Sequence, residues 1–299
     1  MSDFVYLNGQ LLPYDDARIA PADAGLLHGA GLFETMRAKN GKIFRLRQHL
    51  ARLATSAHAL NIPFLLSESQ LADIAADLLD ANGLSTEIGA RLRLTLTRGD
   101  LHEATAENPT PPVTLLLTAA EFHPYPAALY DKGMTVIVSR FKQNPESPLT
   151  GHKSTSYFDR LLALREAQEA HAGEALWFTP YTNVLAEGSI SNVFLVTSEG
   201  ILATPPLTLA DQANQRLCLP GITRQVTLEL ATAAGILPHE RPLTIHDLLA
   251  AKEVFLTNAI MGLMPVTHIE KHTVGDGNPG PLTRQLRAAY EQTLITETA

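Results

Sequence analysis

The spacing of apolar residues predicts a chain of mixed α and β structure. Residues 90–97 alternate strictly, with three leucines on one face and mostly arginine and threonine on the other. This is the pattern of a strand with one buried face. Residues 47–60 repeat apolar side chains with helical spacing, which predicts an amphipathic helix. Arg52 lies beside the apolar face of that helix rather than on it.

Two Asn-Gly pairs and a capping pattern locate further elements in the first half. Gly9 and Gly41, each after an asparagine, separate apolar runs and predict two hairpins, because both residue types tolerate positive φ. Ser67 followed three residues later by Gln70 is typical of a helix start. A strand is predicted over residues 113–118.

The second half predicts another set of strands and helices. Strands are expected over residues 134–139, 253–257 and, as one short antiparallel run, 175–179, 184–187 and 192–197. Helices are expected to follow Tyr157 and Gly221, and to cover residues 245–251 and 282–294.

The length of 299 residues is enough for two cores of moderate size. Residues 121–126 are rich in proline and aromatic side chains, which is typical of a connecting segment. We therefore predict an N-terminal α/β domain in residues 1–120, a linker in residues 121–132 and a C-terminal domain in residues 133–299.

Charge and cysteine content exclude several classes of function. The net charge is −8 and no block of lysine and arginine occurs, which argues against nucleic acid and anionic membranes as partners. The single cysteine, Cys218, excludes an intramolecular disulfide and a cysteine-built metal site, and no metal is expected. Without a signal peptide or a membrane-spanning run, we expect a cytoplasmic protein.

Three separate positions carry candidate chemistry. Lys153 lies between a Pro-rich loop and a predicted helix, where partial burial lowers the pKa of an amine and makes it a nucleophile. Glu187 precedes a Gly-Ser turn, and Thr223 lies in a helix start with free backbone amides that suit an anion. Each position alone also fits an ordinary solvated surface group or helix start. Together, an amine, a carboxylate and an anion site are what pyridoxal phosphate requires.

The chain resembles the class IV, fold-type IV pyridoxal-phosphate enzymes over nearly its whole length. This family includes branched-chain aminotransferases, D-amino acid aminotransferases and aminodeoxychorismate lyases. Six segments carry the resemblance in the same order: GAGLFETMR (29–37), HLARLATSA (49–57), KSTSY (153–157), EGSISNVF (187–194), PGITR (220–224) and FLTNAIMGLMPV (255–266).

The resemblance implies a fold, a cofactor and a set of site residues. The fold is α/β of the α+β type, with a small N-terminal domain and a larger C-terminal domain built on a mostly antiparallel, barrel-like sheet. Lys153 forms a Schiff base with pyridoxal 5'-phosphate, and Glu187 pairs with its ring nitrogen. Tyr157 lies near the phenolic oxygen. The phosphate is held by Arg52, Ile222, Thr223, Asn258 and Ala259.

The implied function is transfer of an amino group from an amino acid to a 2-oxo acid. The alternative is an aminodeoxychorismate lyase, which forms 4-aminobenzoate and pyruvate. Asn258 in its turn is typical of the lyases, whereas Ser154 to Tyr157 is closer to the aminotransferases. Two other classes stay open: a non-enzymatic protein that has kept the fold, and a sugar or nucleotide module that uses the glycine-rich loop at 23–31.

Recognition of the substrate carboxylate requires a cation. Residues 98–102 lack the second loop arginine that many lyases and D-amino acid enzymes use for this purpose. Arg91, Arg93 and Arg98 are the candidate substitutes, with Phe33 as a further substrate residue, although the polar face of strand 90–97 could also be merely solvated. The resemblance also implies a homodimer, in which His28 to Leu32 or His102 of the neighbouring subunit helps to close the site.

Overall fold

The computed structural model describes residues 3–103, 112–209 and 212–299. The chain forms two compact units. Unit 1 consists of residues 1–123, 152–156 and 294–299, and unit 2 of residues 124–151 and 157–293. Among the residues that the structure describes, no helix has both the length and the apolar character needed to cross a membrane.

Unit 1 is a six-stranded antiparallel sheet with helices against it. Its elements are β1 (Phe4–Leu7), β2 (Gln10–Pro13), the 3-10 turn η1 (Tyr14–Asp16), α1 (Ala24–His28), β3 (Gly31–Lys39), β4 (Lys42–Ile43), α2 (Leu46–Ala59), α3 (Glu68–Ala81), β5 (Ala90–Thr97), the 3-10 turn η2 (Leu101–Glu103) and β6 (Thr114–Glu121). The strand order is β2-β1-β6-β5-β3-β4. The predicted hairpins, the capping box at Ser67 and the strand over residues 90–97 are confirmed.

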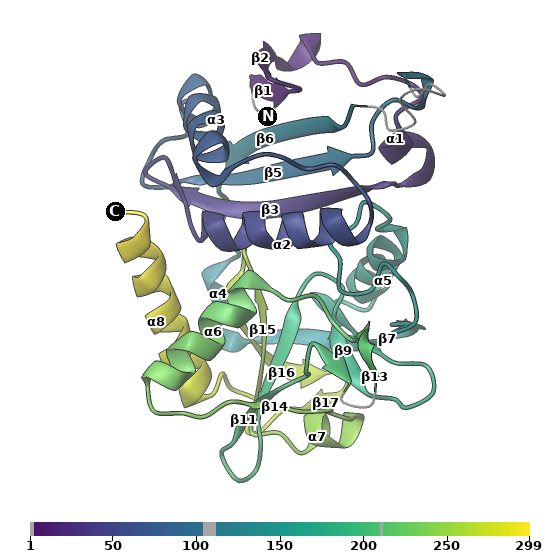
Figure 1. Ribbon diagram of the computed structural model, residues 1–299. Coiled ribbons are helices and arrows are strands. Elements are labelled where there is room, and N and C mark those ends of the chain that lie inside the picture. Colours follow the sequence, from purple (N-terminus) through teal and green to yellow (C-terminus); the bar gives the residue numbers. More distant parts are fainter. Residues whose placement is uncertain (1–2, 104–111, 210–211) are drawn as a thin grey trace. The chain divides into compact units, whose positions relative to one another are not determined.

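Helices α2 and α3 cover one face of the sheet in unit 1 (Figure 1). Their apolar side chains pack against alternate residues of the strands, such as Met36 of β3 and the leucines of β5. The intervening residues of β3 and β5 lie on the opposite face, where Arg91 and Arg93 are exposed. The period of two in residues 90–97 therefore separates a packed face from a polar face.

Unit 2 is built on a larger mixed sheet. Its strands are β7 (Met134–Lys142), β8 (Glu174–Phe178), β9 (Leu185–Gly188), β10 (Asn192–Val196), β11 (Leu202–Thr204), β12 (Thr208–Leu209), β13 (Gln212–Arg216), β14 (His239–Glu240), β15 (Glu253–Asn258), β16 (Gly262–Ile269) and β17 (His272–Thr273). Its helices are α4 (Ala127–Lys132), α5 (Phe158–Glu169), α6 (Ile222–Ala233), α7 (Ile245–Leu249) and α8 (Pro281–Glu297), the last of which ends in unit 1.

The strand order in unit 2 corrects one expectation. The sheet runs β14-β11-β10-β15-β16-β7-β8-β9, so β8 and β9 pair antiparallel but β10 pairs with β11 and β15 instead of β9. The predicted single antiparallel run of three strands is therefore wrong at its third strand. The physical reason is the carboxylate of Glu174, which accepts hydrogen bonds from residues 189–191 and directs the chain away from β9.

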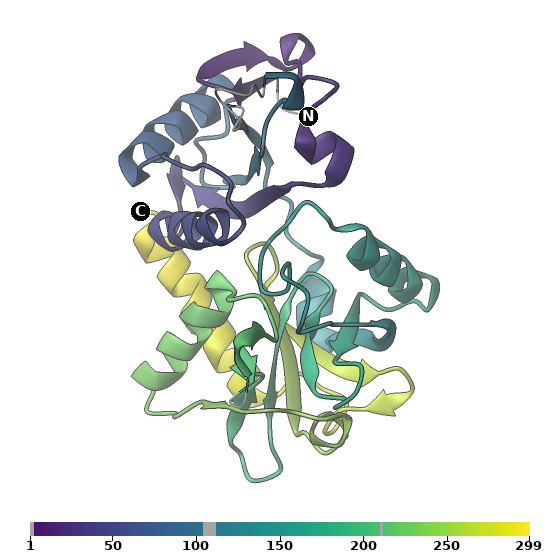
Figure 2. The ribbon, with the colours of Figure 1, turned by 45° about the vertical axis from the view of Figure 1, so that its right-hand side comes forward.

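Both faces of this sheet are buried. Alternate residues of β7, β8, β10 and β15 form one core on the inner face of the sheet. Helix α5 packs against β7 and β8, and α6 packs against β15; the two helices lie on opposite sides of unit 2 in both views (Figures 1 and 2). The crossover through α5 explains why β7 and β8 are parallel, since a parallel pair cannot be joined by a tight hairpin.

The segment expected to be a linker, residues 121–132, contains regular secondary structure. Strand β6 continues through Glu121, and helix α4 occupies residues 127–132. Pro126 precedes the first helical residue and Gly133, with φ of 79°, follows the last, which are favourable flanks for a short helix. Leu129 and Tyr130 pack against the core of unit 2, so this segment belongs to the folded structure.

Candidate functional site

In unit 1, the backbone around Lys153 pairs with the first residues of β3. Phe33 donates its backbone N–H to the carbonyl of Lys153 at 2.8 Å, and Ser154 forms an isolated antiparallel bridge with Leu32. The side chain of Lys153 is half-buried, with Nζ 4.6 Å from the centroid of the Phe33 ring. Lys153 is therefore placed by strand pairing and not by a flexible loop.

Gly31, at the end of the glycine-rich loop, takes part in this strand pairing. Thr155 donates its N–H to the carbonyl of Gly31 at 2.8 Å. A Cβ on Gly31 would lie only 2.9 Å from the carbonyl oxygen of Leu96, so a larger residue would push the strands apart. Close backbone approach accounts for this glycine, and a nucleotide is not needed to explain it.

Arg52 is bound to a carboxylate that faces helix α2. Leu32, Glu34 and Met36 share the helix-facing side of β3, and α2 presents His49 and Arg52, one turn apart, to Glu34. Arg52 donates Nε to Glu34 Oε1 at 2.8 Å and Nη2 to Oε2 at 2.5 Å. His49 Nδ1 lies 2.7 Å from the same Oε2. A forked ion pair of this kind fixes the plane of the guanidinium.

The pKa values in this cluster follow from burial and charge. Burial raises the pKa of Glu34, but the guanidinium of Arg52 and the hydrogen bonds from His49 and Arg52 outweigh it and lower the pKa to about 2. Burial lowers the pKa of His49, and although Glu34 opposes this shift, the positive charges of Arg52 and Lys153 add to it. Glu34 is thus an anion at neutral pH, and it holds Arg52 in place.

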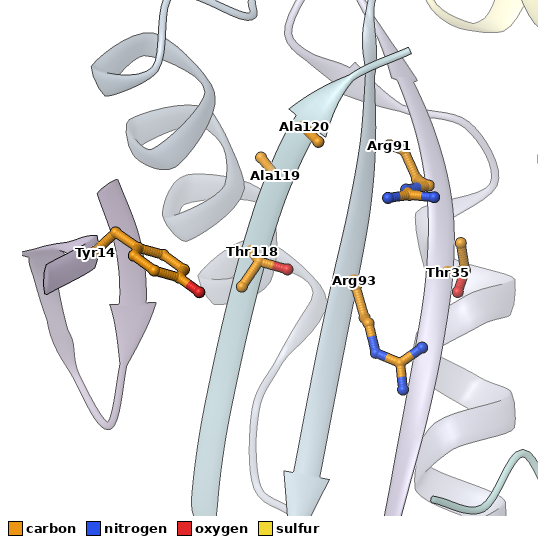
Figure 3. A pocket seen from close by; sticks show the side chains of 7 residues that line it. All are labelled: Tyr14, Thr35, Arg91, Arg93, Thr118, Ala119 and Ala120. Atoms are coloured by element: carbon orange, nitrogen blue, oxygen red, sulfur yellow. The ribbon is translucent and has the colours of Figure 1, made fainter. Parts of the chain in front are cut away.

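The polar face of the sheet in unit 1 contains a pocket of about 410 Å³. Thr35, Arg93 and Thr118 lie directly opposite one another on β3, β5 and β6. Figure 3 shows these three side chains together with Arg91 in the next row of β5 and Tyr14 of η1. No carboxylate is found among the described residues that line it. The pocket is therefore cationic in character.

Arg93 connects this pocket to Lys153. Its Cζ lies 3.9 Å from the centroid of Phe33, the ring that Lys153 also contacts. Arg37 lies directly opposite Arg91 on β3 and stacks on Phe122 at 4.1 Å. Arg37 and Arg91 therefore place two positive charges in opposite positions of the sheet.

The other predicted arginine, Arg98, does not line this pocket. It is an exposed residue beyond the end of β5, and its backbone N–H donates to the carbonyl of Ala30 at 3.0 Å. Within unit 1 the structure thus brings together Lys153, Phe33, Arg91 and Arg93, and it leaves Arg98 apart from the pocket.

In unit 2, Glu187 lies on β9 and is only 3% exposed. Its Oε1 accepts a hydrogen bond from Nη2 of Arg160 at 2.6 Å. Its Oε2 accepts the backbone N–H of Leu219 at 2.9 Å, two residues before Gly221. The carboxylate is therefore fixed at both oxygens, yet each oxygen keeps one further acceptor position.

The turn after Glu187 is organised by a second buried carboxylate. Glu174 accepts the N–H groups of Ser189 and Ile190 and the hydroxyl of Ser191 at 2.8 to 3.1 Å. Burial raises the pKa of Glu174, and these hydrogen bonds oppose the rise. Tyr157 donates its hydroxyl to the carbonyl of Ser189 at 3.0 Å. Tyr157 and Glu187 thus belong to one network.

The predicted anion site at the start of α6 is joined to the same network. Among the described residues, no side chain caps this helix, which begins at Ile222 after Gly221. Its first-turn amides, including that of Thr223, are available to an anion. Asn192 donates to the carbonyl of Leu219 at 2.9 Å, and a Cβ on Gly221 would lie 2.0 Å from its Oδ1. Only glycine allows this close approach.

Asn258 has a structural role in its turn. Its Oδ1 accepts the N–H groups of Ile260 and Met261 at 2.9 and 2.8 Å, and its Nδ2 donates to the carbonyl of Ile190 at 3.2 Å. The neighbouring hydroxyl of Thr257 is buried and has no partner among the described residues. The turn that contains Asn258 and Ala259 is thereby tied to the turn after Glu187.

The donors and acceptors present fit pyridoxal phosphate. In unit 2, the helix start at Ile222 and the orphaned hydroxyl of Thr257 suit a phosphate, and in unit 1 the guanidinium of Arg52 is a donor of the kind that a phosphate accepts. Glu187 retains acceptor capacity for a ring N–H, and Lys153 supplies an amine.

Sequence reasoning missed three residues of these networks: Glu34, Arg160 and Glu174. Glu34 and Arg160 are charged residues inside a predicted strand and a predicted helix, and Glu174 directly precedes a predicted strand; a solvated position is the usual expectation for each. Only the period of two in β3 gave a signal, because it places Glu34 among apolar neighbours on the packed face.

Comparison with known proteins identifies the family of this chain. A family model described as amino-transferase class IV matches residues 31–269. The chain is 30% identical over 295 residues to the D-alanine aminotransferase of Bacillus licheniformis, covering 99% of this chain and 98% of that protein. It is 30% identical over 301 residues to the branched-chain-amino-acid aminotransferase of Salmonella typhimurium, covering 97% and 92%.

A solved structure gives the same result for the fold. The branched-chain amino acid aminotransferase of Escherichia coli matches with a TM-score of 0.87 at 27% identity, covering 100% of this chain and 97% of that chain. The predicted family and its mixed α/β fold are confirmed. The chain belongs to the class IV aminotransferases.

Proposed function

We propose that this chain transfers an amino group from an amino acid to a 2-oxo acid with pyridoxal 5'-phosphate as cofactor and Lys153 as the residue that binds it covalently. The observation that carries this proposal is the shared contact of Lys153 and Arg93 with the Phe33 ring. It puts a nucleophilic amine next to a cation that suits a substrate carboxylate.

Pyridoxal phosphate, when bound, supplies an aldehyde that links to amines and a ring that withdraws electrons from the substrate Cα. The amine of Lys153 would act as the base that takes the proton from the substrate Cα and as the acid that delivers it within the same half-reaction, and in the second half-reaction it would transfer a proton in the reverse direction to the Cα of the new amino acid. Strand pairing with Leu32 and Phe33 fixes the backbone of this lysine, so its proton transfers start from a defined position.

Glu187 is the partner of the ring nitrogen in this proposal. A carboxylate that is fixed by Arg160 and Leu219 accepts a hydrogen bond from a protonated ring nitrogen without reorganising. Tyr157, joined to the same turn through Ser189, is the residue for the phenolic oxygen.

The phosphate is assigned to three groups of donors. The first is the guanidinium of Arg52, which Glu34 orients. The second is the pair of backbone amides of Ile222 and Thr223 at the start of α6. The third is the turn at Asn258 and Ala259. Since the side chain of Asn258 is used within its turn, backbone amides are the donors that we assign there.

The lyase alternative is less well supported. Its sequence argument was the asparagine at position 258, but this side chain is explained by its hydrogen bonds to Ile260, Met261 and Ile190. The relatives described above are aminotransferases with D-alanine or branched-chain amino acids in their names. We therefore infer an amino acid and a 2-oxo acid as substrates.

We further propose that the protein works in the cytoplasm as a homodimer. Helix α1 exposes Leu26 and Leu27 at 69% and 53%, beside the predicted dimer residue His28. Apolar side chains of this kind are typical of an interface. Light scattering at micromolar concentration is expected to give twice the mass of the chain, and a fully active monomer would contradict the proposal.

A half-reaction screen tests the function. D- and L-amino acids are added one at a time to the cofactor-loaded protein without a 2-oxo acid, and the visible absorption band of the cofactor is followed. The band should disappear with at least one amino acid and return on addition of a 2-oxo acid. A band that responds to no amino acid contradicts the proposal, and release of 4-aminobenzoate from aminodeoxychorismate would favour the lyase.

A further inference from the structure

Arg160 lies at the centre of the Glu187 network although no site residue was expected there. It is the third residue of α5, and its guanidinium has four acceptors. Nη1 donates to the carbonyls of Gly188 and Ser189 at 3.0 and 3.1 Å. Nη2 donates to Gln143 Oε1 at 3.1 Å and to Glu187 Oε1 at 2.6 Å.

The surroundings of Arg160 turn it toward the site rather than toward solvent. Its Cζ lies 5.1 Å from the centroid of Trp177, whose Nε1 donates to Ser189 Oγ at 2.9 Å. The Arg160 side chain is 20% exposed and the Glu187 side chain 5% exposed. A charge pair with this little exposure is screened weakly by water.

We infer that Arg160 is a positioning residue that acts on the cofactor through Glu187: its guanidinium holds the carboxylate oriented toward the ring nitrogen. The inference rests on the proposed function.

Two physical arguments support this role. Arginine remains protonated at any working pH, so its charge is a constant partner for Glu187. Without the guanidinium, the carboxylate of Glu187 loses one of the two hydrogen bonds that fix it and can turn away from the ring nitrogen. Removal of Arg160 therefore weakens the contact between Glu187 and the cofactor, even though Arg160 itself is not assigned any contact with it.

A purely structural role would also fit the two carbonyl contacts, so the test must separate the two roles. Arg160→Met is made in the natural protein and in the Glu187→Gln background. Trp177, the single tryptophan of the chain, lies beside the network and reports on binding, because a bound pyridoxal ring quenches its emission. Titration of each apoprotein with pyridoxal phosphate gives a dissociation constant without any measurement of activity.

The inference predicts strong coupling between the two positions. Arg160→Met should weaken cofactor binding by about ten- to a hundredfold in the natural protein and by no more than about threefold in the Glu187→Gln background. Arg160→Lys, which keeps the positive charge but not the forked donors of a guanidinium, should bind the cofactor more tightly than Arg160→Met. Arg165→Met, on the exposed side of the same helix, serves as the control and should bind like the natural protein.

An equal loss of cofactor affinity in both backgrounds, or no loss in either, would overturn the inference. Arg160 would then only stabilise the turn at Gly188 and Ser189. If Arg160→Met does not fold, Arg160→Lys is measured in both backgrounds, with the same criterion. Failure of the proposed function is distinguishable, because then the natural protein itself does not bind pyridoxal phosphate and Trp177 emission does not change.

Discussion

Lys153 and Arg93 contact the same aromatic ring, with Lys153 Nζ 4.6 Å and Arg93 Cζ 3.9 Å from the centroid of Phe33. This relationship links the proposed nucleophile to the cationic pocket on the polar face of the sheet. A carboxylate-binding group therefore lies against the same ring as the proposed nucleophile.

The first prediction concerns this pocket. Arg93→Leu should weaken amino-acid binding about ten- to a hundredfold, because a charge-assisted hydrogen bond to a carboxylate is lost. Arg91→Leu should have a smaller effect, and Arg98→Leu the smallest, since Arg98 does not line the pocket. Substrate titration of the cofactor band measures the change.

The control for this prediction is an amine that has no carboxylate. Arg93→Leu should react with it nearly as well as the natural protein does, and the cofactor should remain bound. If all three variants bind the amino acid like the natural protein, carboxylate recognition lies elsewhere and the polar face is merely solvated.

The second prediction is a pH dependence of stability that arises from Glu34. Its pKa is about 2 in the folded protein against 4.5 for the ordinary group. The lowered pKa stabilises the fold fully above pH 4.5, and this contribution of roughly 3 kcal/mol is lost as the pH falls toward 2. Urea unfolding of the natural protein should therefore show a marked loss of stability between pH 5 and pH 3.

Glu34→Gln isolates this contribution. The variant should be less stable at pH 5, because Arg52 and His49 lose a charged partner, but its stability should fall less between pH 5 and pH 3. The same loss over this pH range in both proteins would show that Glu34 does not carry the effect.

The third prediction concerns Glu174. Glu174→Ala removes the acceptor for the N–H groups of Ser189 and Ile190 and for the hydroxyl of Ser191. Buried donors without acceptors cost about 1–3 kcal/mol each, so a loss of roughly 3 kcal/mol or more is expected in urea unfolding. Glu169→Ala, which breaks an exposed pair with Arg165, is the control and should change stability by less than about 1 kcal/mol.

Local patterns predicted much of the fold. The strand over residues 90–97 and the capping box at Ser67 depend on neighbouring residues only, and both are confirmed. The pairing of β10 and the folded segment at 127–132 could not be predicted, because each depends on contacts with residues far along the chain. The pairing of β10 depends on the hydrogen bonds from residues 189–191 to Glu174, and the sequence neighbours of Glu174 do not reveal that its side chain is buried.

For the candidate site, too, the sequence suggested some residues and not others. Lys153, Glu187 and the helix start at Ile222 were recognisable because their chemistry is visible in short motifs. Arg160 was not, since it lies in a predicted helix, with no feature that separates it from a solvated arginine. Its four acceptors come from two separate parts of unit 2, Gln143 and residues 187–189.

The fourth prediction tests Glu187 directly. Glu187→Gln preserves shape and keeps a hydrogen bond to the ring nitrogen, so the cofactor should stay bound. Turnover should fall by about a hundredfold or more, because a neutral amide no longer favours the protonated ring. Single-turnover kinetics with saturating amino acid measure this step, and an unchanged rate would remove Glu187 from the site.

The most direct measurement of the central claim locates the covalent bond to the cofactor. The protein loaded with pyridoxal phosphate is reduced with borohydride, digested and examined by peptide mass spectrometry. The account predicts a phosphopyridoxyl group on Lys153, and no such group in folded Lys153→Ala, which should also lack turnover. A label on a different lysine, or turnover by Lys153→Ala at a rate comparable with that of the natural protein, would contradict it.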